Sequence, residues 1–270
     1  MTRIIPNRYP VVVDRRGALP VEWPGAAHDG RRPAHGVHDV IVESPRHDRS
    51  ILDVDPRVWR ASWALVGERF AMLSARGDLA WAMVFKNSGP AAGASLDHVH
   101  SQLVALDFVP PVIESKLAAG HGGADPFTRI IREAESQQRV VAATPDLVAL
   151  VPPAPRQPLE TWILPREPGP WFHAAGPAVI AGLADLLREV VARIERAGPG
   201  AEFNWWLHQA PFADPAGGAM ERGGREVPPD WRWHLEIVPR ISPLAGFELG
   251  IGCHISVMSP EASARLLRAD

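Results

Sequence analysis

The chain has 270 residues, a formal net charge of −3 at neutral pH and a single cysteine, Cys253. This length suffices for one large domain or two small ones, and the slightly acidic balance gives no basic face for nucleic acid. One cysteine excludes an intrachain disulfide and a Cys-x-x-Cys metal knuckle. Because the N-terminus "MTRIIPNRYP" lacks an apolar leader and no stretch approaches about 18 apolar residues, we expect a soluble, cytoplasmic protein without a membrane partner.

The first part of the chain predicts a strand, a helix and two more strands. "HDVIVESPRH" (38–47) is typical of a strand, and the helix over about 56–76 has a buried stripe at 4-3-4-3 spacing. The stripe consists of Trp59, Trp63, Val66, Phe70 and Leu73. A strand over 79–87, a Gly-rich loop and a strand that holds His98 and His100 follow.

The second part repeats this order. It predicts a strand over 159–168, a helix over 177–196, a strand over 203–211, a Gly-rich loop over 215–224 and a strand over 232–240. Superposition places His100 over His234 and Gln102 over Glu236, which indicates an internal duplication. The alternative is chance similarity between two amphipathic α+β stretches.

These patterns divide the chain into residues 1–117, 118–145 and 146–270. The middle region is predicted to be a linker, because 118–127 is rich in glycine. A last helix is predicted to begin at Ser259 and Pro260, with the serine as N-cap.

The stretch "SLDHVHSQLVAL" (95–106) carries the chemistry. In an extended chain alternate side chains share a face, so His98, His100 and Gln102 lie together in a site or on a solvated edge. A neutral imidazole is a good nucleophile toward phosphorus. Ser95, Gln102 and the backbone N–H groups of "SGPAAGAS" are candidate donors to phosphate oxygens.

Three motifs carry a family resemblance: "GVHDVIVESPRH", "FKNSGPAAGASLDHVHSQLVAL" and "WHLEIVPRISPLAGFELGIGC". Together and in this order they resemble the galactose-1-phosphate uridylyltransferase family of the histidine-triad superfamily, most of all its ADP-glucose phosphorylase branch. The resemblance implies an α+β fold in which two histidine-triad-like units form one antiparallel sheet with helices packed on it. The first unit would carry the catalytic His-x-His-x-Gln motif and the second would be degenerate.

The resemblance also implies roles for single residues. His100 matches the histidine that becomes nucleotidylated, His98 the first histidine of the motif, and Gln102 the glutamine that holds the phosphoryl oxygens. The residues that match substrate-binding positions are Asn87 and Ser95 near the phosphates, Asn7 near the base and ribose, and Phe247, Glu248 and His254 at the sugar pocket. For Phe247 ordinary strand packing is an equal alternative.

The chain departs from the family at its metal sites. Many members hold two zinc ions with Cys-x-x-Cys pairs, and larger uridylyltransferases hold iron. Here Pro168 and Arg232 stand where two histidine ligands would, and His47 with His98, or His208 with His234, make incomplete sets. We expect no metal and no cofactor.

The function that the resemblance implies is a nucleotidylyltransferase that passes a nucleotidyl group from a nucleotide sugar through His100 to a sugar 1-phosphate. The alternatives are a nucleotide-sugar phosphorylase, with inorganic phosphate as acceptor, and a hydrolase. A fourth possibility is a nucleotide-binding protein without turnover. The base, the sugar and the acceptor stay open.

Family members are commonly homodimers, and we expect a homodimer here. The N-terminal arm "RIIPNRYPVVV" is too short for a core of its own, so it is a candidate to approach the partner's site. Trp205, Trp206, Trp231 and Trp233 are candidates for the interface, since tryptophan is enriched there. The alternative is that they fill the interior.

Overall fold

A computed structural model describes residues 2–14, 16, 34–120, 125–213 and 226–269. The Gly-rich loop expected over 215–224 lies outside these residues. In the described part of the chain, no helix is long and apolar enough to cross a bilayer.

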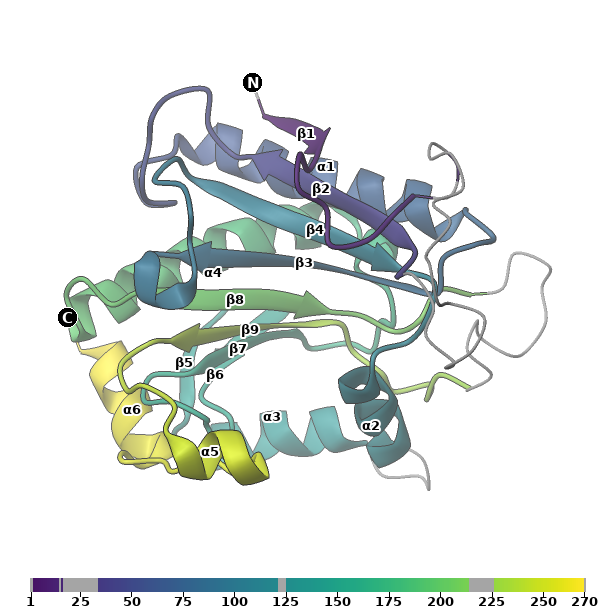
Figure 1. The fold of residues 1–270 in the computed structure, drawn as a ribbon. Coiled ribbons are helices and arrows are strands. Elements are labelled where there is room, and N and C mark those ends of the chain that lie inside the picture. Colours follow the sequence, from purple (N-terminus) through teal and green to yellow (C-terminus); the bar gives the residue numbers. More distant parts are fainter. Residues whose placement is uncertain (1, 15, 17–33, 121–124, 214–225, 270) are drawn as a thin grey trace.

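The described strands form one antiparallel sheet (Figure 1). In spatial order they are β1 (Arg3–Pro6), β2 (Gly36–Val42), β4 (His100–Leu106), β3 (Trp81–Ser88), β8 (Phe203–His208), β9 (His234–Pro239), β7 (Thr161–Pro165), β6 (Leu147–Leu150) and β5 (Val140–Ala143). Helices α1 (Pro56–Ser74) and α4 (Pro177–Ala197) lie across one face, and α2 (Pro111–Gly120) and α3 (Pro126–Ser136) pack at the second half of the sheet.

The predicted duplication is confirmed in the strand order. The first unit contributes β2-β4-β3 and the second contributes β8-β9-β7, so the two halves meet where β3 pairs with β8. At this junction Asn87 lies opposite Asn204. Each half places its helix, α1 or α4, on the same face, and the fold is the α+β fold that the sequence predicts.

The two long helices form where local signals and the apolar stripe agree. The carboxylate of Asp55 accepts hydrogen bonds from the N–H groups at the start of α1, and Pro56 occupies its first position. The predicted stripe on α1 is buried and packs against α4 and the sheet. Helix α6 (Pro260–Arg268) begins at the predicted cap, Ser259.

The interface role expected for the tryptophans is wrong for three of them. Trp205, Trp231 and Trp233 are buried to within 2% inside the single chain, where they fill the core between sheet and helices. Trp206 is half-buried, and the guanidinium of Arg156 stacks 5.0 Å from its ring centre.

The region 118–145 is not the simple linker that its glycines predict. It contains α3 and β5, and only 121–124 lie outside the described residues. Asp125 caps α3 through a 2.8 Å hydrogen bond from the Thr128 N–H, and Phe127 and Ile131 pack against the sheet. The apolar spacing of this helix thus outweighs the glycine signal before it.

Two predicted boundaries also shift. Strand β2 ends at Val42 rather than at residue 47, because Ser44 to Arg46 form a turn in which the Ser44 hydroxyl accepts from the Arg46 N–H. The segment with Phe247 forms the short helix α5 (Gly246–Ile251) rather than a strand, and the helix leaves Phe247 exposed.

Candidate active site at the start of β4

The site lies where the chain enters β4. His100 is the first residue of the strand and His98 precedes it, yet the predicted alternation holds: Val99 and Ser101 are buried, while His98, His100 and Gln102 are partly exposed. The exposed set lies on the face opposite α1 and α4.

The imidazole of His100 is fixed by its own backbone. Its Nδ1 lies 2.8 Å from the carbonyl oxygen of His98. A carbonyl oxygen only accepts, so the neutral ring donates its single proton from Nδ1. The lone pair of Nε2 is then available, as a nucleophile at this position requires.

A buried ion pair supports the backbone beneath His100. Lys86 on β3 and Glu43 are both nearly inaccessible to solvent, and the Lys86 Nζ lies 2.7 Å from a Glu43 carboxylate oxygen. The same ammonium donates a 2.5 Å hydrogen bond to the His100 carbonyl oxygen, and the Ser101 hydroxyl donates to Glu43. Burial lowers the pKa of Lys86, which Glu43 opposes.

A tight loop after β3 forms the opposite wall. Gly89 and Gly93 have φ values of 89° and 85°, in the region that favours glycine. A Cβ at Gly89 would lie 2.3 Å from Cγ of Glu202, whose carboxylate accepts a hydrogen bond from the Ala91 N–H. The loop is therefore held closely against the second half of the protein.

Asn87 is oriented from across the junction of the two halves. The Asn204 amide donates to the Asn87 side-chain oxygen at 2.8 Å and to the Ala92 carbonyl at 2.8 Å. Arg240 donates to the Asn204 oxygen at 2.5 Å, which fixes the Asn204 amide. The Asn87 nitrogen is thereby directed away from β8, with only a 3.4 Å contact to the Gly93 carbonyl.

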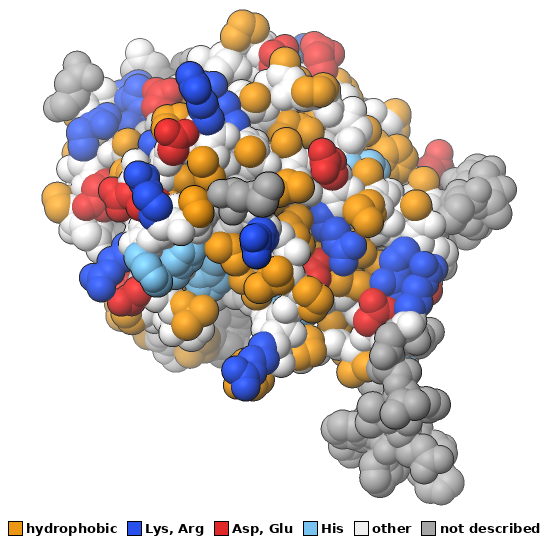
Figure 2. Space-filling model, turned by 90° about the horizontal axis from the view of Figure 1, so that it is seen from above, with side chains coloured by type: hydrophobic (Ala, Val, Ile, Leu, Met, Phe, Trp, Pro, Cys, Tyr) orange, Lys and Arg blue, Asp and Glu red, His pale blue; other side chains and the backbone are white. Residues whose placement is uncertain are grey.

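These walls enclose a pocket of about 160 Å³. Its lining runs over residues 86–90 and 96–100, with Ala94 and Arg49 at the rim. Arg49 and Asp97 form an exposed 3.3 Å ion pair there. Seen from above, the surface carries exposed histidine side chains between positive and negative ones (Figure 2). Hydrogen-bond donors and a nucleophile at one pocket are what transfer of a phosphate ester requires.

Gln102 belongs to a second polar group beside the pocket. The Val11 N–H donates to His38 Nδ1 at 3.2 Å, so the proton of the neutral His38 ring is on Nε2. His38 Nε2 lies 2.9 Å from the Gln102 oxygen and donates to it. The Asn7 amide nitrogen lies 3.0 Å from His38 Nε2 and also donates to the Gln102 oxygen, at 3.5 Å.

The structure brings some predicted site residues together and leaves others apart. His98, His100 and Asn87 line the pocket, and Gln102 with Asn7 lies beside it. Ser95 is exposed in the loop and is not part of the lining. The three residues predicted at the sugar pocket lie on or after α5 and are not part of this lining: Phe247, Glu248 and His254.

The N-terminal arm contacts the site of its own chain. Asn7 reaches Gln102 within one molecule. The expectation that the arm also approaches a partner's site stays a prediction.

Three residues of the site, His38, Lys86 and Asn204, were not predicted from the sequence. His38 shows no local signal, because its partner Gln102 is 64 residues away. Lys86 does show a signal in the sequence, because it and Lys116 are the only lysines among 28 lysine and arginine residues. In the structure both are paired with buried glutamates. A compact ammonium fits a small ring of acceptors that a planar guanidinium does not.

The residues that match metal positions do not form a complete first metal site. The rings of His47 and His98 pack edge to face with centres 5.5 Å apart. Among the described residues, the group of three His, Cys, Asp or Glu side chains close enough to share an ion is elsewhere, at His208, His234 and Glu236. At the other position Arg232 bonds to Asp125 instead.

Comparison with known proteins agrees with these motifs. Residues 28–110 match the family model described as the N-terminal domain of galactose-1-phosphate uridyl transferase, and residues 71–268 match one described as a domain of unknown function, DUF4921. The chain is 30% identical to the ADP-glucose phosphorylase of Arabidopsis thaliana, over 98% of this chain and 73% of that protein. It is 26% identical to the galactose-1-phosphate uridylyltransferase of Thermotoga maritima, over 97% and 82% of the two chains.

Solved structures give the same result for the fold. The Arabidopsis thaliana ADP-glucose phosphorylase with bound ADP-glucose superposes with a TM-score of 0.80 at 28% identity, over 99% of this chain and 81% of that one. A uridylyltransferase structure superposes with a TM-score of 0.85 at 26% identity, over 99% and 83%.

Proposed function

Since the chain belongs to the galactose-1-phosphate uridylyltransferase family, we propose that it is a nucleotide-sugar phosphorylase that works through a nucleotidylated His100. The observation that carries the proposal is the His100 ring: its Nδ1 is bound to the His98 carbonyl, and the residue lines a pocket with the amide of Asn87. ADP-glucose is the first substrate to test, because the relative at 30% identity is named for it.

The reaction would proceed in two displacements. His100 Nε2 attacks the α-phosphorus of ADP-glucose, a P–N bond forms, and the bond from this phosphorus to the bridging oxygen breaks to release glucose 1-phosphate. An oxygen of inorganic phosphate then attacks the same phosphorus, the P–N bond breaks, and ADP leaves. The Nδ1–H of His100 donates to the His98 carbonyl throughout, so the ring carries its positive charge on a hydrogen-bonded side.

The other polar groups would stabilise the transferred phosphoryl group. Gln102 has its oxygen occupied by His38, which leaves its NH₂ group as a donor. Asn87 has its oxygen occupied by Asn204 and likewise offers its nitrogen. Each such donor to a developing charge contributes roughly 3 kcal/mol in comparable enzymes.

Transfer to a sugar 1-phosphate is the second candidate. It is favoured by the similarity to the Thermotoga maritima uridylyltransferase, and the first displacement would be the same. The two functions differ in the acceptor alone. Phe247, Glu248 and His254 are proposed to bind the sugar from the partner subunit of a homodimer, since all three lie outside the pocket lining of their own chain and Phe247 and His254 are exposed.

Intact mass spectrometry tests the proposal. Incubation with ADP-glucose in the absence of phosphate should add the mass of one adenylyl group to the protein, and His100→Ala should not acquire it. Addition of inorganic phosphate should remove the adduct and yield ADP. A near wild-type rate in His100→Ala would contradict the histidine mechanism.

The same assay identifies the acceptor of the nucleotidyl group and the base of the nucleotide sugar. Discharge by a sugar 1-phosphate but not by phosphate would identify a transferase, and loss of the adduct in buffer alone would identify a hydrolase. An adduct that forms only with UDP-sugars would replace ADP-glucose as substrate. Binding without any adduct would indicate a nucleotide-binding protein without turnover.

A further inference from the structure

A second polar cluster lies on the sheet away from the His100 pocket. His208 comes from β8 and His234 and Glu236 from β9, and all three are buried. Their ring nitrogens and carboxylate oxygen lie within 4.8 Å of one another. Two imidazoles and a carboxylate form a ligand set that binds zinc in many proteins.

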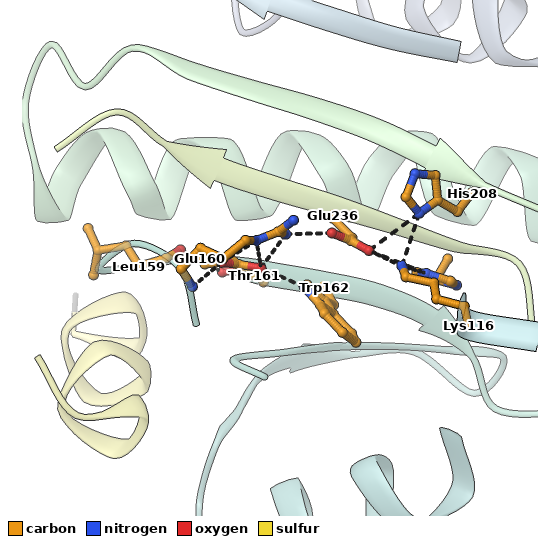
Figure 3. A network of polar contacts seen from close by, with 9 residues as sticks. Lys116, Leu159, Glu160, Thr161, Trp162, His208 and Glu236 are labelled. Atoms are coloured by element: carbon orange, nitrogen blue, oxygen red, sulfur yellow. Dashed lines mark hydrogen bonds and ion pairs between the residues drawn. The ribbon is translucent and has the colours of Figure 1, made fainter. Parts of the chain in front are cut away.

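The ammonium of Lys116, a residue of α2, lies between these groups; Figure 3 shows it beside His208 and Glu236. Its Nζ lies 3.0 Å from His208 Nδ1 and 2.7 Å from His234 Nε2, and it donates to the Glu236 carboxylate. An ammonium has three protons and no acceptor. Three acceptors around it therefore satisfy it completely, and the ring of Trp162 lies 5.4 Å from it as a further favourable contact.

His234 is in the protonation state that this arrangement requires. His234 Nδ1 lies 3.0 Å from the Arg232 carbonyl and donates to it, which leaves Nε2 to accept from Lys116. The same bond holds His100 to the His98 carbonyl in the first half. The second copy thus keeps the orientation of the imidazole, while its Nε2 faces an ammonium instead of a pocket.

The charges of the cluster are balanced without a metal ion. Arg156 bonds to both Glu160 and Glu236 at 2.5 Å, so two cations face two carboxylates. Burial alone would raise the pKa of Glu236, but the positive charges of Lys116 and Arg156 hold it well below its usual range. A divalent ion added to this buried group would leave an excess of two positive charges, which is costly away from water.

We propose that the Lys116 ammonium is a resident cation that occupies a latent divalent-metal site formed by His208, His234 and Glu236. In this chain the lysine holds the three side chains together and excludes a metal ion, both by filling the volume and by supplying the charge. Removal of the lysine side chain should therefore convert the cluster into a metal site.

Cobalt(II) and zinc(II) binding to purified, chelator-treated full-length protein tests this. Lys116→Ala should bind one equivalent of Co²⁺ at least about 100-fold more tightly than the wild type, because the competing cation is gone. The visible absorption should indicate nitrogen and oxygen ligands, and Zn²⁺ should raise the melting temperature of this variant but not that of the wild type. Lys116→Met, which removes the charge but keeps the volume filled, should bind weakly like the wild type.

The ligands are checked in the same background. A second substitution, His208→Ala, in the Lys116→Ala protein should abolish the tight binding. Lys116→Ser serves as a second open variant. The proposal is overturned if the wild type binds a stoichiometric divalent ion at this cluster, or if neither open variant binds one. Failure of both open variants to fold even with Zn²⁺ present also counts against it, since the ion should replace the lost cation.

Discussion

At the scale of single residues, His38 decides which end of the Gln102 amide is available. Its ring accepts from the Val11 N–H on one side and donates to the Gln102 oxygen on the other. A Gln102 amide turned by 180° would place its NH₂ against the Nε2–H of His38, two donors facing each other. His38 is thus a positioning residue: it acts on the proposed reaction through Gln102.

We expect His38→Ala to slow adenylylation of His100 about tenfold, through loss of orientation. Gln102→Ala removes the donor itself and should slow it about 100-fold. The double variant should be no slower than Gln102→Ala alone, because His38 has no effect once the amide is absent. Rapid-quench measurement of adduct formation, with His35→Ala as a control, checks these values.

If the rate losses of the two single variants add in the double variant, His38 acts independently of Gln102. If the slower adenylylation in His38→Ala is matched by a lower melting temperature, the role of His38 is purely structural. The sequence could not predict this residue. His38 and Gln102 meet because β2 and β4 pair with Val40 opposite Gln102, and that register is set by the whole sheet. His100, in contrast, was predictable, because its orienting bond reaches only two residues back.

At the scale of elements, one arginine joins three segments of the second half. The Arg232 guanidinium lies 3.1 Å from the Asp125 carboxylate, donates to the Thr128 hydroxyl at 2.9 Å and donates to the Arg166 carbonyl at 3.1 Å. It thereby connects the entry to β9 with the start of α3 and the end of β7. The family resemblance places zinc-ligating histidines at the positions of Arg232 and Pro168, and in this chain the hydrogen bonds of the Arg232 guanidinium connect the segments.

We expect Arg232→Ala to lower the free energy of unfolding by about 3 kcal/mol, since it removes a buried guanidinium and leaves the partly buried Asp125 carboxylate without its cation. Arg129→Ala is the matched control on α3: its side chain is 72% exposed and its ion pair with Glu133 is 3.9 Å long, so its loss should cost about 0.5 kcal/mol or less. Urea denaturation followed by circular dichroism gives both numbers.

Arg232→Lys should recover only part of the loss, because one ammonium cannot span the three acceptors. Equal stability of Arg232→Ala and Arg129→Ala would rule out the connecting role. The departure of Arg232 from the family pattern is visible in the sequence, but the residues that it contacts are not. Its partners lie in α3, which the glycines at 120–123 concealed as a predicted linker.

At the scale of the whole molecule, the duplicated halves explain why the fold was predictable and the surface was not. The strand–helix–strand–strand order follows from apolar periodicity within each half, and the pairing of β3 with β8 joins the two sheets. Apolar periodicity does not distinguish a core from an interface. The sequence was therefore consistent with these tryptophans in either a core or an interface. The structure places Trp205, Trp231 and Trp233 in the core.

The apolar surface that remains lies in the C-terminal segment. Helix α5 has no buried residue, and the exposed large side chains of this segment are Phe247, Leu249, Ile251, Ile255 and Val257, each more than half exposed. Soluble monomers rarely expose so many apolar groups within a dozen residues. This segment, rather than the tryptophans or the N-terminal arm, is therefore the expected dimer surface.

We expect the wild type to be a dimer by light scattering at micromolar concentration, and Leu249→Asp combined with Ile251→Asp to be a folded monomer. If Phe247 and His254 bind the sugar across the interface, the monomer should also lose affinity for the nucleotide sugar. Met72→Asp, an equally exposed position on α1, should change neither property. A wild-type protein that is monomeric and fully active would contradict both the dimer and the role of Phe247 at the sugar.

Deletion of residues 1–10 should weaken nucleotide binding, because it removes Asn7, and should leave the dimer intact, because Asn7 contacts Gln102 of its own chain.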